Sequence, residues 1–230
     1  MHSLFRVAFM QIKINIKLED FKVNRVVKFF VLSDLFFLGG WGLVNPIFAI
    51  FVVENIPNTS ALTVGALAFT YWIVKSIVQM PVAVALDKRE GEKDDFYTLL
   101  FALVLSGFAA ICFALVKDVF WLFVVQILHG ASQALYTPSW SAIFSRHLDK
   151  ERYAFDWSLD NTTISMASAI AGLVGGVVVS FFGFKTAFLF ASVLSFVGAF
   201  ILMFAPDLIL PKPTLKVPFI RDHTPGNINQ

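Results

Sequence analysis

The sequence is poor in cysteine and in charged residues. Its single cysteine, Cys112, lies within an apolar run of the 230-residue chain, so neither a disulfide framework nor a cysteine-ligated metal site is available. Charged residues make up only 15% of the chain, and the formal net charge is +2. The positive residues fall in short loops rather than on one continuous face, which argues against a nucleic-acid partner.

The sequence also lacks the motifs of common enzyme classes. It contains no His-Glu-x-x-His zinc signature and no glycine-rich phosphate-binding loop. His129 and Ser132 stand three residues apart in one apolar run, without the Gly-x-Ser-Gly setting or the second-helix histidine that an intramembrane serine protease needs. We therefore expect a protein that is not an enzyme and that binds no cofactor.

What the chain has in excess is apolar residues. They make up 57% of the sequence, against roughly 45–50% in a soluble domain, and the mean hydropathy is +0.74. Twenty-seven phenylalanines against four tyrosines put most aromatic side chains among those without a polar group, which suits a surface that faces lipid. These features predict an all-α, polytopic membrane protein.

Six apolar stretches reach the length of about 20 residues that a helix needs to cross a membrane. We place the spans at about 27–53, 62–86, 97–116, 119–144, 156–182 and 186–206, after an N-terminal segment 1–26 and before a tail 207–230. Thr59 or Ser60 is expected to cap the second helix, and Asp118 the fourth. Glycines within 39–42 and 172–176 predict close packing of helices.

The positions of lysine and arginine predict that both termini are cytoplasmic. If the N-terminus is inside, fifteen of the eighteen Lys and Arg residues lie on the cytoplasmic side. The opposite side receives only Lys117 and Lys185, and Lys75 lies within a span. We therefore expect a multi-pass protein of the cell membrane, in contact with lipid.

The loop between the second and third spans resembles the corresponding loop of major facilitator superfamily transporters. In that family it reads approximately Gly-x-Leu-Ala-Asp-Arg-x-Gly-Arg-Arg. Residues 83–93 keep the acid at Asp87, the adjacent base at Lys88 and the glycine at Gly91. This segment differs from the family pattern in three ways: Ala83 replaces the first glycine, one additional residue precedes Gly91, and Glu92 replaces the base that follows the second glycine.

Two further segments resemble the same family. Gly130, Pro138 and the loop 149–152 are similar to its fourth helix and the basic loop that follows. The small residues of 171–176 and the Gly-aromatic-base turn in 182–188 are similar to its fifth helix.

The resemblance covers about residues 27–206 and implies one N-terminal-type half of such a transporter, an MFS-like half bundle of two three-helix repeats. Full members normally have two such halves. It implies transport of a small solute by alternating access, with H⁺ or Na⁺ as candidate coupling ions. Because one half lacks the second wall of the central cavity, a homodimer or a pairing with a second half is expected.

Gln126 replaces an arginine of many members, and Gly172 replaces a proline of the antiporters. The alternative is a non-transporting scaffold or partner subunit.

Two charged residues, Asp34 and Lys75, lie more than one helical turn inside the first two predicted spans. At membrane depth each costs about 2.5–3.5 kcal/mol on insertion scales. Asp34 lies about 10 Å into the first helix, and Lys75 about 18 Å from the cytoplasmic end of the second, at 1.5 Å per residue. We hypothesise that the two neutralise one another across the first and second helices, as a static pair or as a substrate-sensitive switch. The alternative is a lysine that extends toward the membrane surface.

Polar side chains on the fourth helix recur at spacings of three and four, so Gln126, His129, Gln133 and Tyr136 share one face. A neutral His129 near mid-membrane could bind substrate or take up a proton. The alternative is an interhelical hydrogen bond. With the polar residues of the first two helices, the candidate substrate-binding or coupling set is Asp34, Lys75, Gln79, Gln126, His129, Gln133, Trp41 and Asn45.

A second candidate set lies at the cytoplasmic ends of the helices. Asp156 and Asp160 begin the fifth helix, where the helix dipole alone accounts for acids, although a gating role is open. By resemblance, Asp87, Lys88 and Arg152 belong to the charge network that holds one conformation of the transporter closed.

Overall fold

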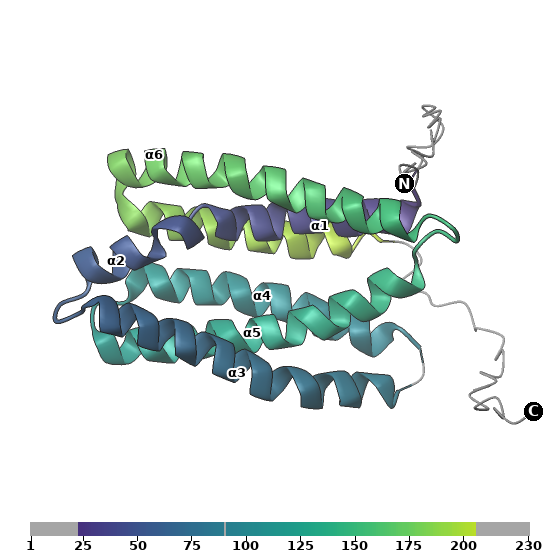
Figure 1. Cartoon of the computed structure of the whole chain (residues 1–230), viewed down its shortest axis with the longest axis horizontal. Helices are drawn as coiled ribbons and strands as arrows, with labels where there is room; N and C mark the ends of the chain where they lie inside the picture. The colour runs from purple at the N-terminus through teal and green to yellow at the C-terminus, as the bar shows by residue number, and fades with distance from the viewer. Residues whose placement is uncertain (1–22, 90, 206–230) are drawn as a thin grey trace, which may run out of the picture.

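The computed structural model describes residues 23–89 and 91–205, and every regular element in this part of the chain is helical. The long helices lie roughly parallel to one another along the long axis of the molecule (Figure 1). The elements are α1 (Arg25–Gly42), the 3₁₀ turn η2 (Asn45–Ile47), α2 (Phe48–Asn55), α3 (Ala61–Asp87), α4 (Lys93–Leu115), α5 (Val119–Arg146) and α6 (Tyr153–Leu202). The predicted segment 1–26 and tail 207–230 lie almost wholly outside the described residues.

Side-chain caps set where several of these helices begin. The side chain of Asn24 accepts a hydrogen bond from the amide of Val26 at the start of α1. Ser60 is the N-cap residue of α3, and Asp118 Oδ1 accepts from the amide of Trp121 at 3.0 Å at the start of α5. The predicted cap at Asp118 is therefore confirmed, and of the two candidates Thr59 and Ser60 it is Ser60 that occupies the N-cap position of α3.

The first apolar stretch is divided rather than continuous. It runs as α1, η2 and α2, and Pro46 lies at the break. A proline has no amide hydrogen, and its ring clashes with the carbonyl four residues earlier, so an α-helix cannot continue through it undisturbed. The break puts Asn45 beside a bend in the middle of the stretch.

The last element, α6, is 50 residues long and contains one non-helical residue, Gly183. An unbroken helix of this length would measure about 75 Å, more than twice the thickness of a bilayer core. The ribbon of α6 instead turns back on itself (Figure 1). We call 153–182 its first arm and 184–202 its second arm. The structure thus has five helices long and apolar enough to cross a membrane among its described residues, with α1 to α2 counted as one and both arms of α6 counted together.

Gly183 is expected to resist substitution, because its backbone angles of φ 79° and ψ 168° belong almost exclusively to glycine. Replacing it with alanine should destabilise the fold by about 1–3 kcal/mol, measured as the free energy of unfolding in mixed micelles. Gly65→Ala is the matched control, since an added Cβ at that helical position meets no atom within 4 Å. Equal stability of the two variants would show that the turn does not depend on glycine.

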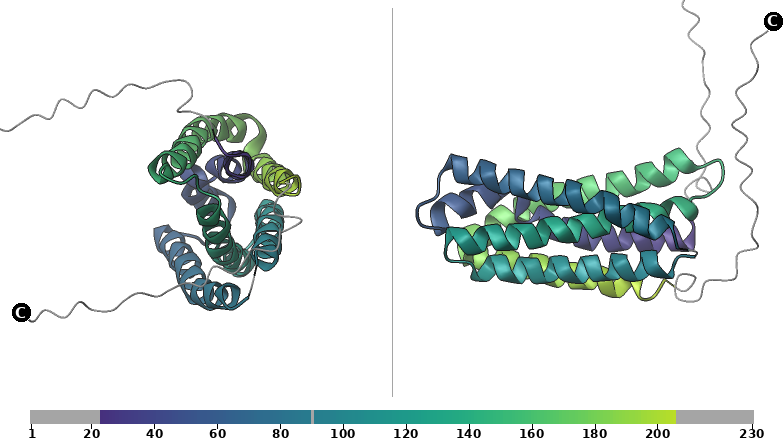
Figure 2. Two further views of the ribbon diagram at one scale, coloured as in Figure 1. Left: turned by 90° about the vertical axis from the view of Figure 1, so that its right-hand side faces the viewer. Right: turned by 90° about the horizontal axis from the view of Figure 1, so that it is seen from below.

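The helix α1 packs between the two arms of α6 (Figure 2). A Cβ at Gly42 would lie 3.1 Å from Ser168 Cα in the first arm, and a Cβ at Gly40 would lie 2.8 Å from Leu194 Cβ in the second. Gly175 approaches the backbone of Leu43 more closely still. Both predicted glycine clusters thus contain close helix contacts, in keeping with the small residues that membrane helices use to pack. On the other side of the bundle, α5 contacts α3 and α4.

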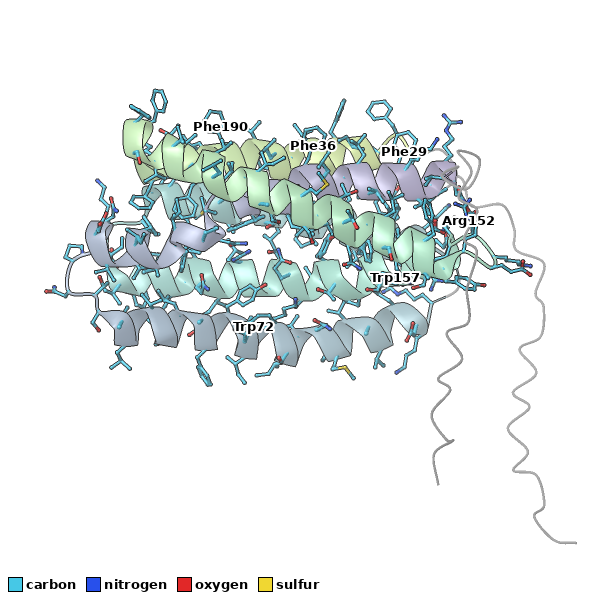
Figure 3. All side chains as sticks on the ribbon, turned by 45° about the horizontal axis from the view of Figure 1, so that its top comes forward. Phe29, Phe36, Trp72, Arg152, Trp157 and Phe190 are labelled. Carbon is cyan, nitrogen blue, oxygen red and sulfur yellow. The ribbon has the colours of Figure 1, made fainter. Side chains whose placement is uncertain are left out.

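Large apolar side chains cover much of the outer surface. Phe29, Phe36 and Phe190 project outward from α1 and α6 in Figure 3. Phe69 on α3 is 67% exposed and Leu173 on α6 is 76% exposed. Such a surface is stable in lipid and costly in water.

Candidate functional site

Polar and aromatic side chains from α1, η2, α2, α3 and α5 surround a pocket of about 440 Å³, which we call the central pocket. It lies between α1, α3 and α5, toward the end of the bundle where α2 connects to α3. Its volume is within the range of small-molecule sites. It is lined by Leu38, Trp41, Asn45, Phe48, Val64, Ala68, Tyr71, Trp72, Gln126, His129 and Gln133.

A ring stack forms one wall of the central pocket. The rings of Trp41 and His129 are nearly parallel, at 8°, with centroids 3.9 Å apart. Trp41 is held by a hydrogen bond from Nε1 to Ser106 Oγ of 2.9 Å, and the ring of Tyr71 lies 5.2 Å from that of His129. The stack therefore joins α1, α4, α5 and α3 and fixes the orientation of the imidazole.

Three side-chain amides give the pocket its hydrogen-bonding capacity. Gln126 donates from Nε2 to the carbonyl of Leu67 at 3.3 Å, while its Oε1 is buried without a partner. Gln133 is also buried, and Asn45 is exposed at the bend of the first stretch. None of the lining residues carries a full charge when the imidazole is neutral.

Of the eight predicted binding or coupling residues, the structure brings five together around the central pocket: Trp41, Asn45, Gln126, His129 and Gln133. Asp34, Lys75 and Gln79 do not line it. Sequence reasoning missed Tyr71 and Trp72. Tyr71 could have been found, because it stands four residues before Lys75 on the same helix face.

The hypothesis that Asp34 and Lys75 neutralise one another is wrong for this structure. The two are not joined by an ion pair within 4.0 Å. Asp34, 1% exposed, accepts a hydrogen bond of 2.7 Å from the Tyr136 hydroxyl on α5. Lys75 is half-buried, with its Nζ 5.4 Å from the centre of the Trp72 ring. The physical reason is that α1 packs mainly on α6, and α3 on α5, so the two side chains belong to different helix contacts.

The two acids at the start of α6 are both buried. Asp156 Oδ2 accepts a hydrogen bond from the amide of Asp149 at 2.9 Å, so this side chain closes the turn before the helix. Asp160 lies one turn further along, 3% exposed, with Oδ1 buried and without a hydrogen-bond partner. The sequence placed both acids in one candidate gate. In the structure only Asp156 accepts a backbone amide hydrogen bond, from Asp149.

The predicted gate residues at the loop ends are more exposed. Asp87 and Lys88 are exposed, and neither forms an ion pair within 4.0 Å among the described residues. Arg152, at the start of α6, lies with its guanidinium carbon 4.5 Å from the centre of the Phe155 ring, at the end of the bundle where Figure 3 labels it. A gating role for these residues stays a prediction.

An ion-pair network that the sequence did not reveal joins α4 and α5 at the same end. Arg146 donates to the carboxylate of Asp95, which is 1% exposed. His147 lies 3.6 Å from a Glu92 oxygen, and the carbonyl of His147 accepts from the side chain of Asn24 at 3.2 Å. These contacts tie the starts of α1 and α4 to the end of α5.

Comparisons with known proteins identify the family to which these apolar helices belong. The profile of the Major Facilitator Superfamily matches residues 30–224. The chain is 24% identical over 179 residues to an uncharacterised MFS-type transporter of Methanocaldococcus jannaschii. The alignment covers 77% of this chain and 45% of that relative, so the chain spans less than half the length of the relative it matches. The chain is a multi-pass membrane protein that belongs to the Major Facilitator Superfamily.

Proposed function

We propose that this chain forms half of a secondary transporter that moves a small solute across the membrane by alternating access. The observation that carries the proposal is the central pocket, which places three side-chain amides and a histidine inside a bundle of membrane-length apolar helices. Polar groups at membrane depth are costly and therefore usually face a partner or a ligand.

The bundle is proposed to cross the membrane six times. The first residues of α1 and the last described residues of α6 lie at the same end of the molecule (Figure 1). Helices that begin and finish on one side of a membrane make an even number of crossings, which favours counting the two arms of α6 separately. Arg146 and Arg152 lie at that end, while Lys117 and Lys185 are at the other. The positive-inside rule then favours a cytoplasmic position for both ends.

The lining of the central pocket favours a neutral solute with a flat apolar part and a few hydrogen-bonding groups. Aromatic faces at Trp41, Tyr71 and Trp72 suit the apolar part. The amides of Gln126 and Gln133 both donate and accept, which suits hydroxyl, amide or ring-nitrogen groups. A strongly charged solute would enter without a counter-charge among the lining residues.

A second bundle is proposed to complete the pocket, supplied by a second copy of this chain or by another half. In the end-on view of Figure 2, α3 and the first arm of α6 flank the same side of the bundle. Both carry large exposed apolar residues, such as Met80 at 66% on α3 and Ile170 at 62% on α6. Native mass spectrometry in gentle detergent should detect a pair of bundles, and purely monomeric six-helix units would count against the pairing.

A solute screen on the purified protein tests the proposed binding. One class among sugars, nucleosides, amino-acid amides and aromatic amides should raise the melting temperature. Gln133→Met keeps the size of the side chain and removes its amide, so it should weaken binding of that solute by about 2- to 13-fold, as expected from losing a hydrogen bond of about 0.5–1.5 kcal/mol. Titration calorimetry measures the change.

Asn161→Leu is the matched control, because it also removes an amide but lies on an exposed face of α6 and bonds only to its own helix. Binding should be unchanged in this variant. If the two variants bind equally well, the central pocket is not the solute site. If no solute class binds and the polar lining can be replaced without effect, the scaffold alternative replaces transport.

A further inference from the structure

A second pocket, of about 390 Å³, lies where α4 and α5 are joined. We call it the rim pocket. Its lining residues all fall within 112–125, from the last turn of α4 through the connection to the second turn of α5. None of them lines the central pocket. The volume is within the range of small-molecule sites, so the rim pocket is large enough to hold part of a ligand.

The rim pocket is apolar at depth and polar at its mouth. Cys112 of α4 and Val125 of α5 lie one to two helical turns inside the bundle. Lys117 and Asp118 belong to the connection, Trp121 to the first turn of α5, and all three are exposed. The ends of membrane helices meet the headgroup layer, where tryptophan is enriched. The mouth of the rim pocket is therefore expected to face lipid headgroups, and its deeper part the acyl chains.

The proposed pairing of two bundles would leave the rim pocket open to lipid. The second bundle is proposed to approach α3 and the first arm of α6, and neither of these lines the rim pocket. The helix α4 packs instead on the second arm of α6, where the ring centroids of Phe108 and Phe196 are 5.5 Å apart. Trp121, at the mouth of the rim pocket, is 55% exposed.

The mouth carries one charge of each sign, and the two charges do not neutralise one another. Lys117 forms no ion pair within 4.0 Å in the described ranges 23–89 and 91–205. Asp118 Oδ1 accepts the amide hydrogen of Trp121 at 3.0 Å, which holds the carboxylate at the start of α5. An ammonium group binds a phosphate, and a carboxylate binds an ammonium group. A headgroup with both charges therefore fits, whereas a purely anionic headgroup would meet the charge of Asp118.

We infer that the rim pocket binds a phospholipid with a zwitterionic headgroup of the phosphoethanolamine type. The phosphate lies against Lys117, the ammonium group against Asp118, and an acyl chain against Cys112 and Val125. Binding of this lipid does not rest on the proposed transport. Only its assignment to the outer leaflet rests on the proposed orientation, which puts Lys117 on the side opposite the termini.

Native mass spectrometry of the purified protein, with equal amounts of phosphatidylethanolamine and phosphatidylglycerol, tests the site. The wild type should retain the ethanolamine lipid preferentially. Lys117→Gln should weaken its binding by about 2- to 5-fold, as expected from losing an exposed ion pair. Lys185→Gln is the matched control, because it removes an exposed lysine at the same end of the bundle but outside the rim pocket. This control should bind the lipid like the wild type.

Asp118→Asn separates the two charges of the headgroup. Asparagine caps a helix about as well as aspartate, so the start of α5 should be kept while the negative charge is lost. The variant should therefore lose the preference for the ethanolamine over the glycerol headgroup. An unchanged preference in Asp118→Asn, or equal weakening in Lys117→Gln and Lys185→Gln, would overturn the proposal.

Water-soluble phosphoethanolamine distinguishes a lipid from a free phosphate ester. If it displaced the lipid at equal concentration, the rim pocket would be a site for a soluble ester and the lipid proposal would be wrong. Should Asp118→Asn fail to fold, the comparison of Lys117→Gln with Lys185→Gln decides the matter. No transported solute is needed, so failure of this inference is distinct from failure of the proposed transport.

Discussion

Gly175→Ala should prevent recovery of folded protein or destabilise it by about 3 kcal/mol or more, one of the two largest effects expected of a single change. An added Cβ would lie 2.0 Å from the carbonyl oxygen and 2.7 Å from the carbonyl carbon of Leu43. These are backbone atoms at the end of α1, so they cannot move away as a flexible side chain would. Overpacking of this kind commonly costs about 1–3 kcal/mol, and more where the backbone itself must shift. Thermal unfolding and the monodisperse yield after extraction measure the effect.

Gly176→Ala provides a control at the next residue of the same helix. A Cβ there meets no atom within 4 Å. Alanine also favours a helix by up to about 1 kcal/mol over glycine, so this variant should be as stable as the wild type or slightly more so. If Gly175→Ala matched it in yield and melting temperature, α1 and α6 would not pack as the structure describes.

Removing the positive partner of Asp95 is expected to be nearly as damaging. Arg146→Met keeps most of the aliphatic stem but leaves the carboxylate of Asp95, 1% exposed, without its cation. Breaking a buried pair in this way costs about 3–5 kcal/mol. The Arg146 side chain is 40% exposed, so water reaches the site and the lower end of this range, about 3 kcal/mol, is expected. The melting temperature should fall accordingly.

The same substitution at Arg89 should have little effect. Arg89 lies 4.0 Å from Asp94 with 72% of its side chain exposed, and pairs of this kind contribute about 0–1 kcal/mol. Adding Asp95→Asn to Arg146→Met should restore part of the lost stability, because the buried charge is then gone. Equal losses in Arg89→Met and Arg146→Met, with no recovery in the double variant, would contradict a specific role for the buried pair.

The sequence predicted the helical architecture well because apolar length and breaks are local properties. Charges after Asp87, the cap at Asp118 and the loop after Arg146 marked helix ends close to those observed. The break at Pro46 was less predictable, since a proline inside an apolar stretch either bends a helix or divides it, and the outcome depends on packing. The turn at Gly183 depends on a backbone conformation that no residue pattern specifies alone.

The central pocket was partly predictable for a similar reason. The spacing of Gln126, His129 and Gln133 put them on one helix face, and the structure directs that face into the pocket. Contacts between helices were not predictable, because they depend on which helices are neighbours. Asp34 therefore pairs with Tyr136 rather than with Lys75.

The ion pair at Asp95 was missed because the predicted third span begins at 97, which leaves Asp94 and Asp95 in the loop before it, whereas α4 begins at Lys93. The two acids are neighbours with the same local sequence context. Only the tertiary structure distinguishes them, since Asp95 faces the end of α5 and Asp94 faces the loop at Arg89.

The break at Pro46 divides the first stretch into α1 and α2, and these two helices contact α6 through different kinds of residue. We call the break the joint. On one side, α1 is fixed by glycine contacts to both arms of α6. On the other, Phe51 of α2 packs on Phe184 and Phe188 near the turn of α6. Asn45 and Phe48 line the central pocket beside the joint itself. A change in the angle between α1 and α2 at Pro46 would therefore reshape the wall of the central pocket while leaving the glycine contacts of α1 intact. A molecule bound against Asn45 and Phe48 would in turn favour one value of that angle.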